Sequence, residues 1–136
     1  MILSGEVYFN PEYLLPNGEL HPSYFIILES ADLSHDALCV MTTSRNWRDS
    51  NSSVGCNPDT NVFYIPQKWQ SIFPLDSWIV MPLIYSISFK EILDYREKRH
   101  WKPVGKISKA CLQEIIDCLK HYEEIIDSDY AKRLFN

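Results

Sequence analysis

The fold of this chain is decided by two apolar stretches, SYFIIL at residues 23–28 and ALCVMT at residues 37–42. The first is rich in aromatic and β-branched residues, which favour strands. The second is too short for a helix and lacks helical spacing, so we expect a strand that is buried on both faces. Similar short runs occupy residues 6–9, 62–65 and 77–81. Together these runs predict a sheet of at least five strands.

Turn signals separate the runs. An Asn-Pro pair at residues 10–11 ends the first run, a Pro-Asn-Gly loop at 16–18 leads to the second, and residues 71–76 form a turn that tucks two apolar side chains inward. Residues 102–107 contain a proline near their start and are expected to be extended. Short strands at this spacing are typical of a small antiparallel barrel. We therefore predict a mainly β fold of the α+β class.

Two helix start signals lie in the last third of the chain. Ser88 and Glu91 match a capping box, which predicts a helix over residues 89–99. Ser108 is expected to cap a longer C-terminal helix from about residue 109. The apolar side chains of that second helix follow i, i+3, i+4, i+7 spacing and are Leu112, Ile115, Ile116, Leu119, Tyr122 and Ile126. Both helices should be appended to the barrel, with the second packing one stripe on it.

Composition predicts a single domain over residues 1–136. Hydrophobic residues make up 46% and charged residues 23%, which is enough for one core and excludes a disordered chain. The formal net charge is -5, so nucleic acid cannot be held by bulk charge and needs a local basic face. Basic residues concentrate in residues 96–109. No stretch is long and apolar enough for a membrane span or a signal peptide, so we expect a cytoplasmic protein without membrane contact.

The cysteine pattern predicts small buried thiols. Cys39, Cys56, Cys111 and Cys118 fit neither a CxxC metal site nor a dense disulfide framework. Cys111 and Cys118 would lie about 10 Å apart along a helix, which is beyond disulfide reach. Metal-ligand spacing and a phosphate-binding glycine loop are both absent from the sequence, so no cofactor is expected.

Candidate chemistry gathers where the third predicted strand ends. Residues 44–61 are rich in Ser, Asn and Asp, and a loop of this length in a small domain is commonly functional. The side chains suited to holding a phosphate there are those of Thr42, Thr43, Ser44, Arg45 and Arg48. A polar strand exit with no ligand is the simpler interpretation of the same residues.

Four tryptophans are candidate platforms on which a base could stack, namely Trp47, Trp69, Trp78 and Trp101. Trp47 stands between Arg45 and Arg48 in the polar loop and is the best candidate. Trp101, beside the basic run, comes next. Trp78 lies in an apolar strand and is expected in the core.

Short motifs along residues 5–126 occur together in the order of a known family. They are GEVYF at 5–9, GELHP at 18–22 leading into YFIIL at 24–28, VMTTS at 40–44, SWIV at 77–80, LIYSIS at 83–88 and VGKIS at 104–108. On these motifs the sequence resembles the PemK/MazF family of toxin ribonucleases.

The resemblance implies an SH3-like barrel that is usually a homodimer, cuts single-stranded RNA without a metal and is held inactive by an antitoxin protein. The family's hydroxyl after the third strand falls on Thr43, with Thr42 and Ser44 beside it. His21 stands just before the proline of the second strand, where the family usually has arginine. Tyr85 stands where the family has a second arginine and is the implied phosphate contact at that position.

Metal-free RNA cleavage needs a base for the 2′-hydroxyl, an acid for the leaving 5′-oxygen and donors for the charged phosphorane. His21 can serve as acid or base because the ordinary pKa of histidine is about 6.5. The sequence thus predicts a toxin endoribonuclease with His21, Thr43 and Ser44 as catalytic residues and Arg45 and Arg48 as electrostatic donors. The alternative is an inactive barrel that binds RNA or a protein, with His21 as a plain turn residue.

Overall fold

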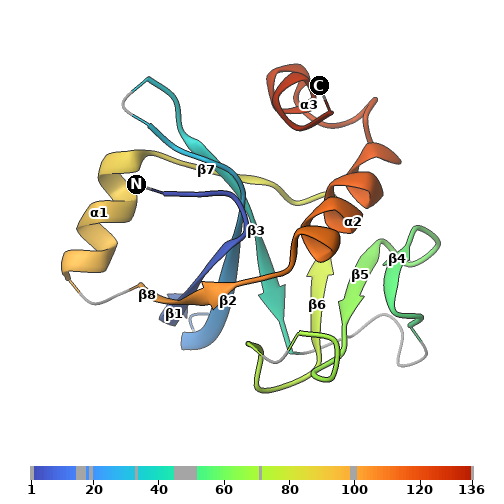
Figure 1. The fold of residues 1–136 in the computed structure, drawn as a ribbon, viewed down its shortest axis with the longest axis horizontal. Helices are drawn as coiled ribbons and strands as arrows, with labels where there is room; N and C mark the ends of the chain where they lie inside the picture. Colours follow the sequence, from blue (N-terminus) through green and yellow to red (C-terminus); the bar gives the residue numbers. More distant parts are fainter. Residues whose placement is uncertain are drawn as a thin grey trace.

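The computed structural model describes residues 2–14, 18, 20–32, 34–44, 52–70, 72–98 and 101–135. Within them, one antiparallel sheet of eight strands is flanked by three helices (Figure 1). The strands are β1 (Glu6–Leu14), β2 (Leu20–Glu29), β3 (Ala37–Thr43), β4 (Gly55–Asn57), β5 (Val62–Ile65), β6 (Ser77–Val80), β7 (Tyr85–Ile87) and β8 (Lys102–Lys106). The helices are α1 (Phe89–Glu97), α2 (Lys109–Lys120) and α3 (Ser128–Phe135). The predicted mainly β fold with a C-terminal helix is confirmed.

The strand order along the sheet is β4-β5-β6-β3-β2-β1-β8. Strand β3 lies at its centre, and all seven of its residues are buried or half-buried, as predicted for a strand covered on both faces, with Ala37 to Val40 fully covered. One edge of β3 is shared, because β7 pairs with its start and β6 pairs with its end. The end of β3 is therefore held between β2 and β6, and this is where the sequence placed its hydroxyl cluster.

The sheet is not closed into the predicted barrel. Strands β4 and β8 end the order, and no pairing between them occurs within the described residues. Helix α2 instead packs over the curved face between them and contacts β4 (Figure 1). Closure by a helix makes strand-to-strand closure unnecessary, because the apolar face is already covered.

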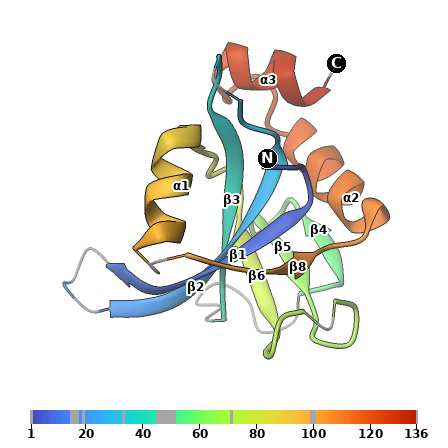
Figure 2. The same cartoon turned by 60° about the vertical axis from the view of Figure 1, so that its left-hand side comes forward.

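The sheet buries one core on each face. The first core contains Val40 of β3, Phe63 of β5 and Ile115 of α2, all fully buried. The second core contains Phe25 of β2, Ile92 of α1 and Trp101, with at most 3% of each residue exposed. Figure 2 shows α1 and α2 on opposite sides of the strands. The alternation of side chains along a strand assigns successive residues to these two cores.

Both predicted helix caps are present. The Ser88 hydroxyl accepts from the Glu91 amide at 3.0 Å, and the Glu91 carboxylate accepts from the Ser88 amide at 3.3 Å, which completes the capping box. The Ser108 hydroxyl accepts from the Cys111 amide at 3.1 Å. These bonds satisfy amides that an uncapped helix would leave without partners.

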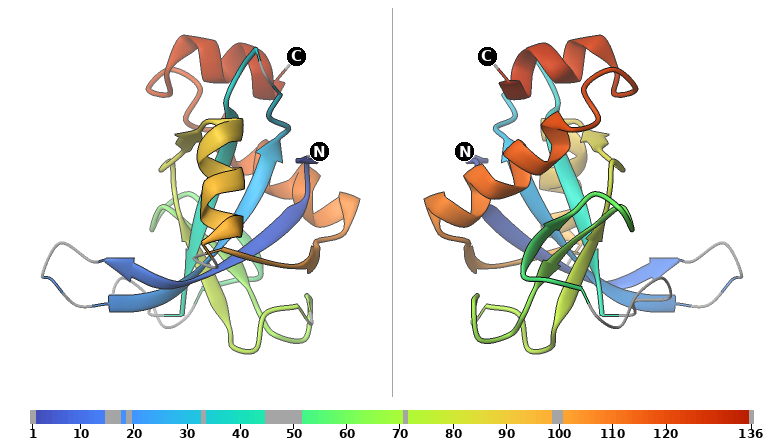
Figure 3. Two further views of the ribbon diagram at one scale, coloured as in Figure 1. Left: turned by 90° about the vertical axis from the view of Figure 1, so that its left-hand side faces the viewer. Right: turned by 90° about the vertical axis from the view of Figure 1, so that its right-hand side faces the viewer.

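The C-terminal helix differs from the prediction, which carried its apolar stripe through Ile126. Helix α2 ends at Lys120, and α3 follows a turn because the Asp127 carboxylate accepts from the Asp129 amide at 2.9 Å and so caps a new helix. Figure 3 shows α3 over the end of the sheet where β2 leads to β3. There the Arg133 guanidinium donates to both carboxylate oxygens of Glu29, at 3.0 and 3.1 Å.

The cysteine prediction was wrong for one pair. Cys56 and Cys118 form a disulfide between β4 and α2, with their Cα atoms 5.5 Å apart, whereas Cys39 and Cys111 are buried thiols as predicted. Strand β4 is not among the predicted strands, because Cys56 lies in the segment expected to be a loop. Pairing across 62 residues follows from tertiary contact and not from spacing. Among the described residues, no helix is long and apolar enough to cross a membrane.

Candidate functional site

A cavity of about 370 Å³ lies at the end of β3, between the start of β2 and the turn before β6. Its described lining consists of Phe9, Ser23, Tyr24, Thr42, Ser44, Pro74, Leu75 and Ser77. Two predicted site residues, Thr42 and Ser44, therefore face a common cavity. None of the described lining residues carries a charge.

Strand register explains why these residues meet. Phe9 of β1 pairs with Tyr24 of β2, and Tyr24 pairs with Thr42 of β3. Directly paired side chains lie on the same face of a sheet, about 5 Å apart at Cβ. The three side chains therefore form one row that points to the first-core side. Ser77 joins them because it lies two residues before Ile79, the β6 partner of Thr42.

Aromatic rings form the wall of the cavity on the β1–β2 side. The rings of Phe9 and Tyr24 have centroids 5.0 Å apart, and the rings of Tyr24 and Phe73 form a T-shaped pair with centroids 5.2 Å apart. Phe73, one of the apolar residues predicted to turn inward, is fully buried and holds the Tyr24 ring in place. Burial raises the pKa of Tyr24 above its usual value, so its hydroxyl stays protonated at neutral pH and is able to donate a hydrogen bond.

Hydroxyl groups occupy the opposite wall. Thr42 and Ser77 are 1% and 4% exposed, whereas Ser44 is open to solvent. The Ser77 hydroxyl donates to the Leu75 carbonyl at 3.0 Å, and its remaining lone pair can accept from a ligand. The cavity thus offers flat apolar walls and neutral hydrogen-bonding groups, a combination suited to an unstacked base with its ribose.

The structure separates Thr43 from this cavity. Thr43 pairs with Trp78 of β6, and Trp78 pairs with Tyr64 of β5. Strand alternation places this row on the face opposite Thr42. The rings of Trp78 and Tyr64 stack with centroids 5.1 Å apart, and both residues are half-buried. The expectation that Trp78 belongs to the core was wrong, because it belongs to neither core and lies beside Thr43.

His21 can be placed by its backbone alone, since its side chain lies outside the described part of the chain. It belongs to β2 and pairs with Tyr13 of β1. The pairing of Tyr24 with Thr42 runs antiparallel, so the start of β2 and the end of β3 meet at one end of the sheet. The backbone of His21 therefore lies at the same end of the sheet as Thr43.

The remaining predicted residues fall into two groups. Arg45, Trp47 and Arg48 lie outside the described residues. Tyr85 of β7 lies elsewhere, half-buried against the second core, with the centroid of its ring 6.1 Å from that of Phe25. The structure therefore does not bring Tyr85 into the cavity. Trp101, the second candidate for a base-stacking platform, is 3% exposed and packs in the second core, so it does not present a ring to a ligand.

Sequence reasoning missed the aromatic half of the cavity. Tyr24 was recognised as part of a strand, and Phe9 as the end of another, but neither was assigned to the site. The signal was alternation: Tyr24 and Thr42 fall on one face once β2 and β3 are paired antiparallel. Ser77 could not be placed without the register of β6.

Within the described residues, no group of three or more His, Cys, Asp and Glu side chains is arranged to hold a metal ion. In comparisons with known proteins, no family model matches the chain and no curated protein is significantly similar to it in sequence. The structure therefore defines a class of fold, an open antiparallel sheet with helices on both faces, and a neutral cavity at the end of its central strand.

Proposed function

We propose that the protein is an endoribonuclease of the toxin type that cuts single-stranded RNA without a metal. The observation that carries the proposal is the cavity in which Thr42 and Ser44 meet the rings of Phe9 and Tyr24. Aromatic walls bind unstacked bases, which single-stranded RNA offers and a duplex does not. Hydroxyls at the same strand end supply donors for the adjoining phosphate.

In the proposed reaction a base removes the proton of a ribose 2′-hydroxyl, and the 2′-oxygen attacks the adjacent phosphorus. The bond to the 5′-oxygen breaks, and an acid protonates that oxygen, which leaves a 5′-hydroxyl end and a cyclic phosphate. His21 is assigned the acid or base role because β2 carries it to this end of the sheet. Ser44 binds the scissile phosphate beside the cavity, and Arg45 and Arg48 stabilise its charge.

We also propose that the fold is related to the SH3-like barrel of the family that the sequence resembles. Its support is the order of motifs along the chain and the strong bend of the antiparallel strands around the first core, here covered by α2. A homodimer, an antitoxin partner and a cytoplasmic location belong to the same proposal. Exposed apolar side chains at Leu75 and Leu83, 60% and 51% exposed, offer surface for such partners. Light scattering of the purified protein measures whether it is a dimer.

Cleavage of a long unstructured RNA in EDTA tests the proposal, with 5′-hydroxyl ends mapped afterwards. His21→Ala should lower the cleavage rate by roughly 10²- to 10⁴-fold, the range for loss of an acid or base. Ser44→Ala should lower it less, by about 2- to 10-fold, because one neutral hydrogen bond is worth about 0.5–1.5 kcal/mol. Ser34→Ala, in the turn at the other end of β2 and β3, is the matched control and should cut normally.

A binding module without catalysis is the second candidate, favoured by the absence of charge from the described cavity lining. It predicts that wild-type protein holds the same RNA in a filter-binding assay and leaves it uncut. Uncut and unbound RNA would contradict both functions.

A further inference from the structure

The disulfide between Cys56 and Cys118 lies at one end of a row of paired residues whose other end is the cavity. In the sheet register, Cys56 pairs with Phe63, Phe63 pairs with Ile79, and Ile79 pairs with Thr42. Thr42 then pairs with Tyr24 of the aromatic wall. Paired residues share a face, so the row runs across the floor of the first core from the disulfide to the cavity.

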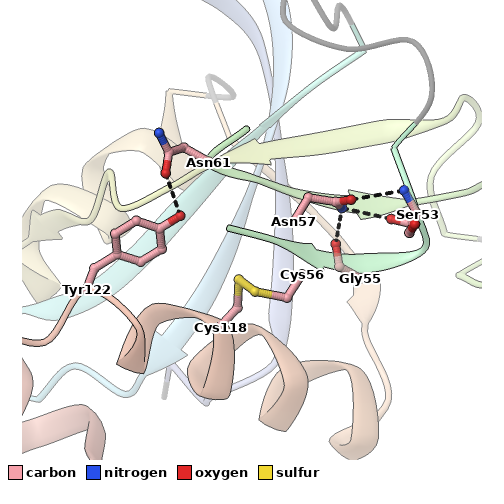
Figure 4. The surroundings of a disulfide bond; sticks show 7 residues. All are labelled: Ser53, Gly55, Cys56, Asn57, Asn61, Cys118 and Tyr122. Atoms are coloured by element: carbon pink, nitrogen blue, oxygen red, sulfur yellow. Dashed lines mark hydrogen bonds between the residues drawn. A yellow bond between two sulfur atoms is a disulfide. The ribbon is translucent and has the colours of Figure 1, made fainter. Parts of the chain in front are cut away.

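Helix α2 and the turn that follows it are attached to the neighbouring strands at two points. The disulfide joins Cys118 of α2 to Cys56 of the edge strand β4, and the Tyr122 hydroxyl donates to the Asn61 side-chain oxygen at 2.8 Å (Figure 4). Asn61 in turn holds β6, because its carbonyl accepts from the Met81 amide at 2.9 Å. The disulfide is therefore the covalent part of the set of contacts that holds α2 against strands β4, β5 and β6.

The other two cysteines are unsuited to thiol exchange. Cys39 and Cys111 are fully buried, and burial raises the pKa of each thiol to about 12. Neither forms a useful amount of thiolate, which is the reactive species. Cys56 is half-buried, whereas Cys118 is fully buried, so the Cys56 side is the more accessible side of the bond for a reductant.

We propose that Cys56–Cys118 is a redox-modification site through which a dithiol reductant controls RNA binding at the β3 cavity. The inference rests on the proposed function for the identity of the ligand and for a reducing cytoplasm. Disulfides of cytosolic proteins are usually transient and redox-sensing, not permanent. In the oxidised protein the disulfide holds α2 on β4 and the cavity keeps its shape. In the reduced protein α2 is free to move away from β4.

The switching step balances as thiol–disulfide exchange. A thiolate of the reductant attacks the Cys56 sulfur, the S–S bond breaks, and the Cys118 sulfur leaves and takes up a proton. The second thiol of the reductant then attacks the mixed disulfide and releases the Cys56 thiol. The protein gains two electrons and two protons, and the reductant becomes a cyclic disulfide.

The experiment compares oxidised and dithiothreitol-reduced protein, with the bond state checked by mass spectrometry after alkylation. Reduction should weaken binding of a fluorescent single-stranded RNA about tenfold, within the 5- to 150-fold range typical of coupling between sites. Circular dichroism should remain that of folded protein. The double variant Cys56→Ser/Cys118→Ser should bind weakly with or without reductant, whereas Cys39→Ala should keep the full response.

A second readout separates this inference from the RNA proposal. Amide hydrogen exchange at Thr42 and Ser77 should become faster on reduction, and exchange at Ile27, on the second-core side of β2, should not. If no RNA binds in either state but the exchange difference appears, the proposed ligand is wrong and the redox coupling stands. Equal exchange in both states, equal RNA affinity in both states, or unfolding on reduction would overturn the inference.

Discussion

The two faces of the sheet close in different ways. On the second-core side the rings close on one another: Trp101 stacks on Phe25 at 4.6 Å and on Tyr95 at 5.4 Å, and α1 covers Phe25 and its neighbours with Ile92. On the first-core side the packing begins at the disulfide and changes from apolar side chains to hydroxyls at Thr42. The second-core face is sealed by rings, whereas the first-core face is left with a cavity at one strand end.

The largest effect on stability is expected from a substitution in the second core. Trp101→Ala removes a buried ring from the second core and should lower the free energy of unfolding by about 3–5 kcal/mol. Urea denaturation measures the loss. RNA affinity per folded molecule should be unchanged, because Trp101 does not line the cavity. A parallel fall in affinity would mean that both faces contribute to the site.

The next effect is on the open face. Cys118→Ser removes a cross-link that closes a loop of 62 residues and should cost about 2–5 kcal/mol of unfolding free energy. The matched measurement is urea denaturation of wild-type protein with and without reductant. The variant should follow the reduced curve under both conditions. A variant as stable as the oxidised protein would show that the core alone holds α2.

The two helix caps offer a smaller and symmetrical comparison. Ser88→Ala uncaps α1 and Ser108→Ala uncaps α2, and each should cost about 0.5–2 kcal/mol of stability. Ser108→Ala alone should also weaken RNA binding, because α2 covers the face that contains the cavity. Thermal denaturation together with a filter-binding assay distinguishes the two. Equal effects on binding would remove the distinction between the faces.

The smallest effect is the labelling of the two buried thiols, one from each core. Burial raises the pKa of Cys39 and of Cys111 to about 12, so at pH 8 about one molecule in 10⁴ carries the thiolate. Iodoacetamide should therefore leave both residues unmodified in the native protein and label them after unfolding. The thiolate fraction rises with pH, so labelling should begin only in strongly alkaline solution. Labelling at pH 8 would show that a core opens.

Local patterns in the sequence were sufficient for much of the sheet and both capped helices. The β5 bounds at Val62–Ile65 agree with the prediction, because a short run ends at a proline that cannot continue the strand. Ser88 and Glu91 likewise determine the start of α1 through contacts three residues apart. Such signals involve residues close together in the sequence, so they can be recognised without knowledge of the fold.

The features that sequence reasoning missed depend on long-range pairing. Strand β4 and its disulfide depend on Cys56 meeting Cys118 across the core, and the aromatic wall depends on Tyr24 pairing with Thr42. The expected barrel failed for the same reason, since nothing near the strands reveals that α2 covers the opening. Thr42 and Ser44 were identified because the hydroxyls directly follow a buried strand.

The most direct test of the cavity as the RNA site is photocrosslinking with a single-stranded RNA that contains 4-thiouridine. After digestion, mass spectrometry identifies the cross-linked peptides. We expect cross-links to the peptides that carry Tyr24 and Leu75, which line the cavity. These cross-links should disappear when unlabelled single-stranded RNA competes. Cross-links confined to the basic surface of β8 and α1, with neither cavity peptide labelled, would contradict it.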